Sequence, residues 1–177
     1  MLRMILSYGA ISGLIVGLTL SGVTIAMNHQ SSSWGMVIGY LTMLIALSAV
    51  FVAIKRRRDV DLGGVIRFWP AFGLGLGISF VASIFYVLAW ETTVAITQID
   101  FASGYAKMMI DEQKAKGVSG EALAKLTAEM DKFKTDYANP LFRLPMTFAE
   151  IFPVGLLVSL VSAGLLRNSR FLPARRT

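Results

Sequence analysis

The sequence contains no cysteine, which excludes disulfide bonds and thiolate metal ligands. Charged residues are also scarce, at 16% of the chain, and there is one histidine, His29. A hydrolase, a metal enzyme or a redox protein would normally show a nucleophile with its base, a cluster of metal ligands, or paired haem-ligating histidines. The sequence has no such motif. It therefore predicts a non-enzymatic protein without a cofactor, and we interpret His29 as a residue of the membrane interface.

Apolar residues dominate the chain instead. They make up 55% of it, and the mean hydropathy of +0.63 departs strongly from that of soluble proteins. A helix needs roughly 20 apolar residues to cross a ~30 Å hydrocarbon layer, and four runs reach that length, at about 4–27, 36–54, 68–97 and 148–166. None alternates as a barrel strand would. The sequence predicts an all-α polytopic membrane protein, with residues 1–177 forming a single membrane domain.

The basic residues indicate an orientation. The short segment after the second run holds Lys55, Arg56, Arg57 and Arg58, and further arginines lie near both termini, whereas the segment between the first two runs has no Lys or Arg. Because Lys and Arg in short loops favour the cytoplasmic side, we expect both termini in the cytoplasm. We expect the four basic residues to attract anionic lipids. A nucleic acid is not an expected partner, because this basic run lies beside membrane spans.

Residues 98–140, between the third and fourth runs, form the one long polar stretch. Its apolar residues recur at helical spacing in two stripes separated by the turn sequence "GVSG", and Ser119 is placed to cap the second helix. We therefore expect a helical hairpin on the extracytoplasmic side. Either the two stripes pack on each other, or one of them docks a partner, a second copy or the outer leaflet. The stripes are Phe101, Tyr105, Met108 and Met109, and then Leu123, Leu126, Met130, Phe133 and Tyr137.

Small residues recur every four positions inside the spans, a pattern that lets helix backbones approach closely. The spacing does not decide whether these contacts form within one chain or between copies in a homo-oligomer, although an intramolecular bundle is the first expectation. The predicted packing positions are Gly9, Gly13, Gly17, Gly73, Gly77 and Gly155.

Three stretches carry a resemblance to a known family. They are "GYLTMLIALSAVFVAIKRRRD", "GGVIRFWPAFGLGLGISFVASIFYVLAWE" and "NPLFRLPMTFAEIFPVGLLVSLVSAGLLR". Together they resemble the bacterial domain-of-unknown-function family numbered 4199. The resemblance covers nearly the whole chain and implies a small bacterial inner-membrane protein with four helices and an outer helical segment. It implies no activity and no catalytic or binding residues.

Glu91 and Glu150 are unusual because they stand within or beside the apolar runs. The third run passes outward and the fourth inward, so we expect both glutamates near the outer interface and close to each other. We expect the last helix to begin near Pro145, which puts Glu150 in its first turn, where the helix dipole favours a carboxylate. Ionisable groups within spans are a functional hypothesis by default.

Three interpretations of these glutamates stay open. Arg143 is available to pair with either of them as a structural anchor, the two carboxylates could form a proton or cation site, or they could contact a partner. The sequence thus favours a structural or accessory membrane protein, with a small proton- or ion-coupled carrier using Glu91 and Glu150 as the alternative.

Overall fold

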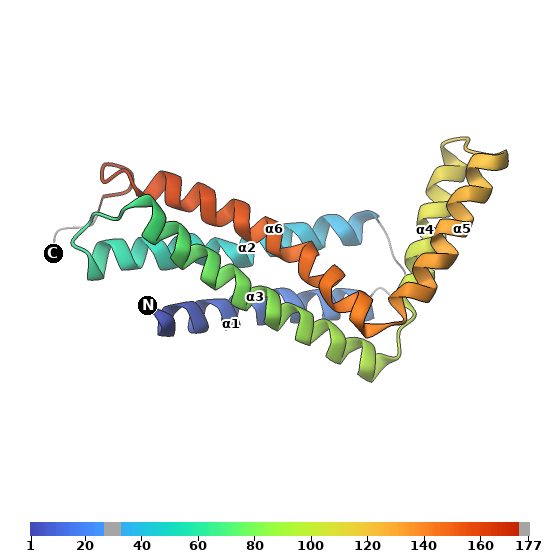
Figure 1. The fold of residues 1–177 in the computed structure, drawn as a ribbon, viewed down its shortest axis with the longest axis horizontal. Coiled ribbons are helices and arrows are strands. Elements are labelled where there is room, and N and C mark those ends of the chain that lie inside the picture. The colour runs from blue at the N-terminus through green and yellow to red at the C-terminus, as the bar shows by residue number, and fades with distance from the viewer. Residues whose placement is uncertain (27–32, 174–177) are drawn as a thin grey trace.

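The computed structural model describes residues 1–26 and 33–173, and within them the chain is helical with no β-strand (Figure 1). His29 and the predicted end of the first run at Met27 lie outside the described residues. The described helices are α1 (Leu2–Ala26), α2 (Ser33–Arg56), the π-helix η1 (Arg57–Asp61), α3 (Phe68–Thr97), α4 (Phe101–Ala115), α5 (Gly120–Tyr137) and α6 (Pro140–Leu166).

Within the described residues, four helices are long and apolar enough to cross a membrane, as predicted. The third predicted run coincides with α3. The fourth does not, because α6 begins at Pro140, and the expectation of a start near Pro145 is wrong. Asn139 caps α6 by accepting a hydrogen bond from the backbone N–H of Leu141 at 3.0 Å, and a proline is well tolerated in the first turn. Glu150 therefore lies several turns inside the helix.

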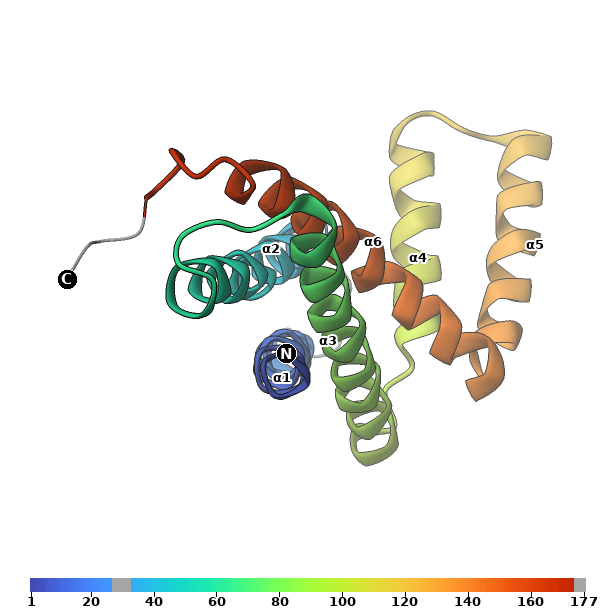
Figure 2. The same ribbon diagram turned by 60° about the vertical axis from the view of Figure 1, so that its left-hand side comes forward.

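The four long helices form a bundle in which α1 and α6 each pack against both α2 and α3 (Figure 2). Aliphatic side chains such as Leu47, Val50 and Ile78 fill its centre and are fully buried. The start of α1 and the end of α6 lie at one end of the bundle, which we call the terminal end, while α4 and α5 project from the other (Figure 1). The two ends of the bundle therefore differ in structure.

Glycines allow these helices to approach each other. A Cβ atom added to Gly13 would lie 2.3 Å from the carbonyl oxygen of Ala82, and Gly9 and Gly17 are similarly close to α3. Gly155 of α6 would meet the side chain of Ser79 at 2.6 Å. These predicted stripes are therefore contacts within one chain.

The prediction for Gly73 is wrong, whereas that for Gly77 is confirmed. Gly73 is exposed and has no neighbour within 4 Å of an added Cβ, but Gly77 would lie 3.0 Å from Ile5 of α1. The close approach to α6 occurs at Gly75, which would lie 2.9 Å from Ser159. Gly73 lies on the exposed side of α3, whereas the next residue, Leu74, is buried in the core.

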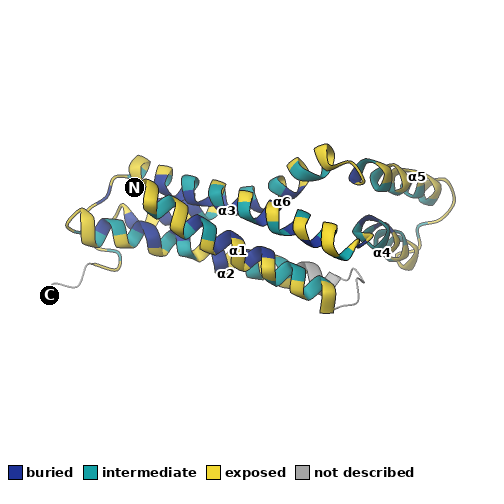
Figure 3. Cartoon of the chain, turned by 90° about the horizontal axis from the view of Figure 1, so that it is seen from below, coloured by how far each residue is buried: buried dark blue, intermediate teal, exposed yellow. Residues whose placement is uncertain are grey.

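Exposed residues run along the outside of the bundle (Figure 3), and many of them are large and apolar. Leu18, Ile45 and Leu157 are 66%, 71% and 63% exposed. A soluble protein rarely exposes apolar patches of this extent, whereas hydrocarbon is a favourable surrounding for them. The described helices are those of a membrane protein.

Helices α4 and α5 lie side by side (Figure 2). The rings of Tyr105 and Phe133 face each other across the pair at 5.6 Å. Asp100 caps α4 by accepting a hydrogen bond from the N–H of Ser103 at 3.0 Å, and this interaction lowers the pKa of the Asp100 carboxyl. Ser119 occupies the cap position of α5, but its side chain makes no capping hydrogen bond, so that part of the prediction is wrong.

Candidate functional site

The predicted site residue Arg143 lies against Glu91. Arg143 is in the first turn of α6, and its Nε and Nη2 atoms donate to the two carboxylate oxygens of Glu91 at 2.7 and 2.6 Å. Its Nη1 atom donates to the backbone carbonyl of Tyr137 at 3.2 Å. The side chains of Arg143 and Glu91 are 11% and 23% exposed. This paired-fork geometry is the strong form of an arginine–carboxylate contact.

Two buried aromatic residues complete the arrangement. The indole N–H of Trp90 donates to the hydroxyl of Tyr137 at 2.8 Å, and the guanidinium of Arg143 lies 5.6 Å from the centre of the Tyr137 ring. Burial raises the pKa of the Tyr137 hydroxyl to about 12. We call Trp90, Glu91, Tyr137 and Arg143 the junction.

The junction connects three helices. Trp90 and Glu91 are on α3, Tyr137 is the last residue of α5, and Arg143 opens α6. Sequence reasoning missed both Trp90 and Tyr137, because Trp90 lies inside the third apolar run and Tyr137 was assigned to the apolar stripe. The sequence offers only a general signal for these two residues: a buried Trp or Tyr needs a hydrogen-bond partner for its polar atom. The junction fixes where α5 and α6 meet α3.

Glu150 has a different partner. Its Oε2 atom accepts a hydrogen bond from the hydroxyl of Tyr86 at 3.0 Å. Tyr86 is fully buried in α3, whereas the Glu150 residue is exposed. Glu91 binds Arg143 and Glu150 binds Tyr86, so the structure does not join the two carboxylates through a common partner.

Glu150 also lies deeper in the bundle than Glu91. Tyr86 is eleven residues before the end of α3 at Thr97, and Glu91 is six before it. At about 1.5 Å per residue, these positions are about 16 and about 9 Å from that end. The expectation that the two glutamates share one depth is therefore wrong, because the hydrogen bond to Tyr86 places Glu150 further inside.

The terminal end contains a buried basic residue. Arg58 of η1 is fully buried, and it donates to the backbone carbonyls of Phe171 at 2.9 Å and Leu172 at 2.5 Å. Its Nε atom also pairs with Asp59 at 2.6 Å. The prediction that Arg58 contacts anionic lipid is wrong, because its side chain binds the segment after α6 instead.

The other residues of that basic run differ from Arg58. Lys55 forms an ion pair with Asp59, and Arg57 pairs with Asp61 at 3.0 Å. Arg56 is exposed. For these three residues, Lys55, Arg56 and Arg57, contact with anionic lipids stays a prediction.

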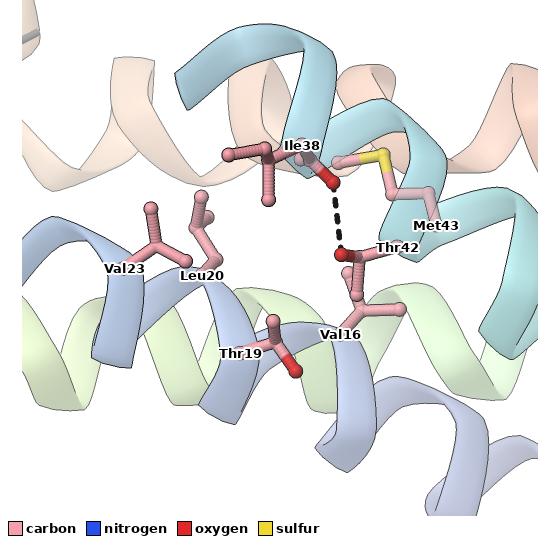
Figure 4. A pocket seen from close by; sticks show the side chains of 8 residues that line it. Val16, Thr19, Leu20, Val23, Ile38, Thr42 and Met43 are labelled. Atoms are coloured by element: carbon pink, nitrogen blue, oxygen red, sulfur yellow. Dashed lines mark hydrogen bonds between the residues drawn. The ribbon is translucent and has the colours of Figure 1, made fainter. Parts of the chain in front are cut away.

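A shallow crevice lies between α1 and α2 (Figure 4). Its cavity volume is only about 10 Å³, and it is lined mainly by aliphatic side chains. The hydroxyl of Thr42 donates to the carbonyl of Ile38, and Thr19 is the other polar side chain of the lining. In the described parts of the chain, no group of three or more His, Cys, Asp or Glu residues is placed to hold a metal ion.

One of the three comparisons with known proteins gives a match. The family model described as "Protein of unknown function (DUF4199)" matches residues 7–168. No curated protein and no solved structure matches the chain.

Proposed function

Since the chain belongs to this family of unknown function, we propose its role from the junction: a non-enzymatic accessory protein that holds α4 and α5 in position at one end of a membrane bundle. The positioned pair would contact another component of a membrane complex. The distribution of Lys and Arg in short loops supports a cytoplasmic location for both termini in a bacterial inner membrane, with α4 and α5 outside.

The single observation behind this proposal is the paired contact between Glu91 and Arg143. A carboxylate that carries protons or ions must exchange its partners, whereas both oxygens of Glu91 accept hydrogen bonds from one guanidinium. That guanidinium also binds the last carbonyl of α5, at Tyr137. Glu91 and Arg143 thus hold α3, α5 and α6 in a fixed orientation, which is what an accessory role requires.

Helices α4 and α5 offer a surface suited to contact with a protein. Exposed lysines such as Lys107 and Lys125 alternate with exposed acidic residues such as Asp111 and Glu129. Mixed charges of this kind favour specific contacts over general adhesion to an anionic surface.

Site-specific crosslinking in native membranes tests the proposal. The chain has no cysteine, so a photoreactive label at Lys107→Cys or Lys125→Cys is unique. We expect one adduct of discrete mass from both positions, and a reduced yield when Arg143→Gln is added. Ile45→Cys, on the apolar outside of α2, is the control and should give no such adduct.

The alternative function is the proton- or ion-coupled carrier, and the exposure of Glu150 inside a span is the observation that favours it. Purified protein in liposomes under a pH gradient separates the two functions. Flux that disappears in Glu150→Gln, together with no discrete adduct from α4 or α5, would support the carrier over the accessory protein.

A further inference from the structure

The carboxylate of Glu150 can accept more hydrogen bonds than the described part of the bundle supplies. In the described residues its carboxylate forms no ion pair and accepts one hydrogen bond, from Tyr86. The residue is exposed although α6 is one of the candidate membrane spans. A carboxylate has several acceptor positions, so one neutral donor leaves most of them open.

The depth of Glu150 makes this arrangement costly in lipid. With 30 residues, α3 is about 45 Å long and exceeds a ~30 Å hydrocarbon layer by about 15 Å, or roughly 7 Å at each end. Tyr86, whose hydroxyl donates to Glu150, occupies a position about 16 Å from the end of α3, which is several Å inside the hydrocarbon. Intramembrane carboxylates at such depths are rare and usually face a partner or a cavity.

We propose that Glu150 is a docking point for a membrane-spanning helix of a different protein that carries a Lys or Arg in the outer half of its span. The inference deepens the proposed accessory role by naming the chemistry of the partner, and it rests on that role. Charge complementarity selects a cation, because the open carboxylate positions need donors. Tyr86 holds the carboxylate in place without neutralising it.

A second copy of this chain does not fit as the occupant. In and beside the described spans, Lys and Arg lie near the helix ends, at Arg3, Lys55–Arg58, Arg67, Arg143 and Arg167. Arg143 is the one nearest in depth, and it is committed to Glu91 and to the carbonyl of Tyr137. The cation must therefore come from another protein.

A synthetic peptide provides the test without knowledge of the natural partner. An acceptor-labelled polyleucine span with one Lys placed about 8 Å below its outer interface is incorporated into liposomes with protein labelled at Lys125→Cys. Energy transfer should show association roughly three- to twentyfold tighter than with the all-Leu peptide, the range of polar contacts between membrane helices. Glu150→Gln should abolish the preference, because the amide can still accept from Tyr86 but carries no charge.

Matched controls decide the remaining outcomes. Glu129→Gln, on the exposed face of α5, should keep the preference for the lysine peptide. Equal association of the two peptides with the unmodified protein would overturn the proposal. Energy transfer between donor- and acceptor-labelled copies of the protein that depends on Glu150 would also overturn it, in favour of a dimer. Neither result changes the crosslinking expected from α4 and α5, so the docking site and the accessory role fail separately.

Discussion

Arg143 and Glu91 meet through two side-by-side hydrogen bonds of 2.7 and 2.6 Å, although they are 52 residues apart in the chain. The contact joins the start of α6 to the last turns of α3, beside the end of α5. The contribution of this contact to stability can be measured, because glutamine can replace either residue and removes its charge.

The first prediction is therefore a double-mutant cycle. Glu91→Gln and Arg143→Gln should each lower the thermal unfolding temperature in detergent, and the double variant should recover part of the loss. We expect a coupling free energy of about 0.5–2 kcal/mol, because the pair is partly exposed near an interface. Additive single effects would show that the pair does not anchor the helices.

A second prediction concerns the close packing of α1 against α3. Gly13→Ala places a methyl group 2.3 Å from the carbonyl oxygen of Ala82, so the helices must separate. We expect a loss of about 1–3 kcal/mol in unfolding free energy, as for overpacked cores. Gly22→Ala, in the same helix with nothing within 4 Å, is the control and should be neutral or stabilising by up to about 1 kcal/mol. Equal effects of the two substitutions would contradict the packing.

The limits of sequence reasoning differ between the helices. The third span was predictable to its end residues because its run from Phe68 to Thr97 is interrupted by only one charged residue, Glu91. The start of α6 was not, because Asn139–Pro140 is equally suitable as the end of one helix and the cap of the next. That ambiguity shifted the expected position of Glu150 within the helix.

The candidate site shows a similar division. Pairing of Arg143 with a glutamate was predictable because few charges stand near the spans. The contact of Glu150 with Tyr86 was not, since no spacing rule relates residues on different helices and Tyr86 lies in an apolar run. Nor does a run of four basic residues reveal which one is buried, because the π-helical turn η1 alters the side-chain directions there.

A third prediction tests that buried basic residue. Arg58→Gln removes donors from the carbonyls of Phe171 and Leu172, and Leu172 has a left-handed φ of 46°. We expect a loss of about 1–3 kcal/mol, as for buried hydrogen bonds left unmade, and faster proteolysis after α6. Arg57→Gln breaks only an exposed pair with Asp61 and should cost about 0.2–0.5 kcal/mol. Unchanged proteolysis in Arg58→Gln would show that this residue does not hold the segment.

A fourth prediction concerns the contact between α4 and α5. Leu126 and Phe133 are half-buried, so replacing both with Ser should loosen the pair and speed proteolysis between residues 100 and 140, with membrane insertion intact. Lys125→Ser with Lys132→Ser alters exposed positions of the same helix and should leave the rate unchanged. If Leu126 and Phe133 can be replaced without effect, their stripe is free to serve a partner instead.

The last prediction uses the Tyr137 hydroxyl. Tyr137→Phe leaves the buried indole N–H of Trp90 without its acceptor, which should cost about 1–3 kcal/mol at neutral pH. Burial raises the pKa of Tyr137 from 10.0 to about 12, so the unfolded chain ionises first as the pH rises. The stability that the neutral hydroxyl contributes is complete below pH ~10 and is lost as the pH approaches ~12.

Thermal unfolding in detergent measures this directly. The gap in unfolding temperature between the unmodified protein and Tyr137→Phe should be constant from pH 7 to ~10 and should close towards pH ~12, because only the tyrosine can ionise. Other tyrosines and lysines titrate in both proteins and cancel in the difference. A gap that stays constant to pH ~12 would mean that the Tyr137 hydroxyl is not held in the buried contact with Trp90, and the junction would then consist of the ion pair alone.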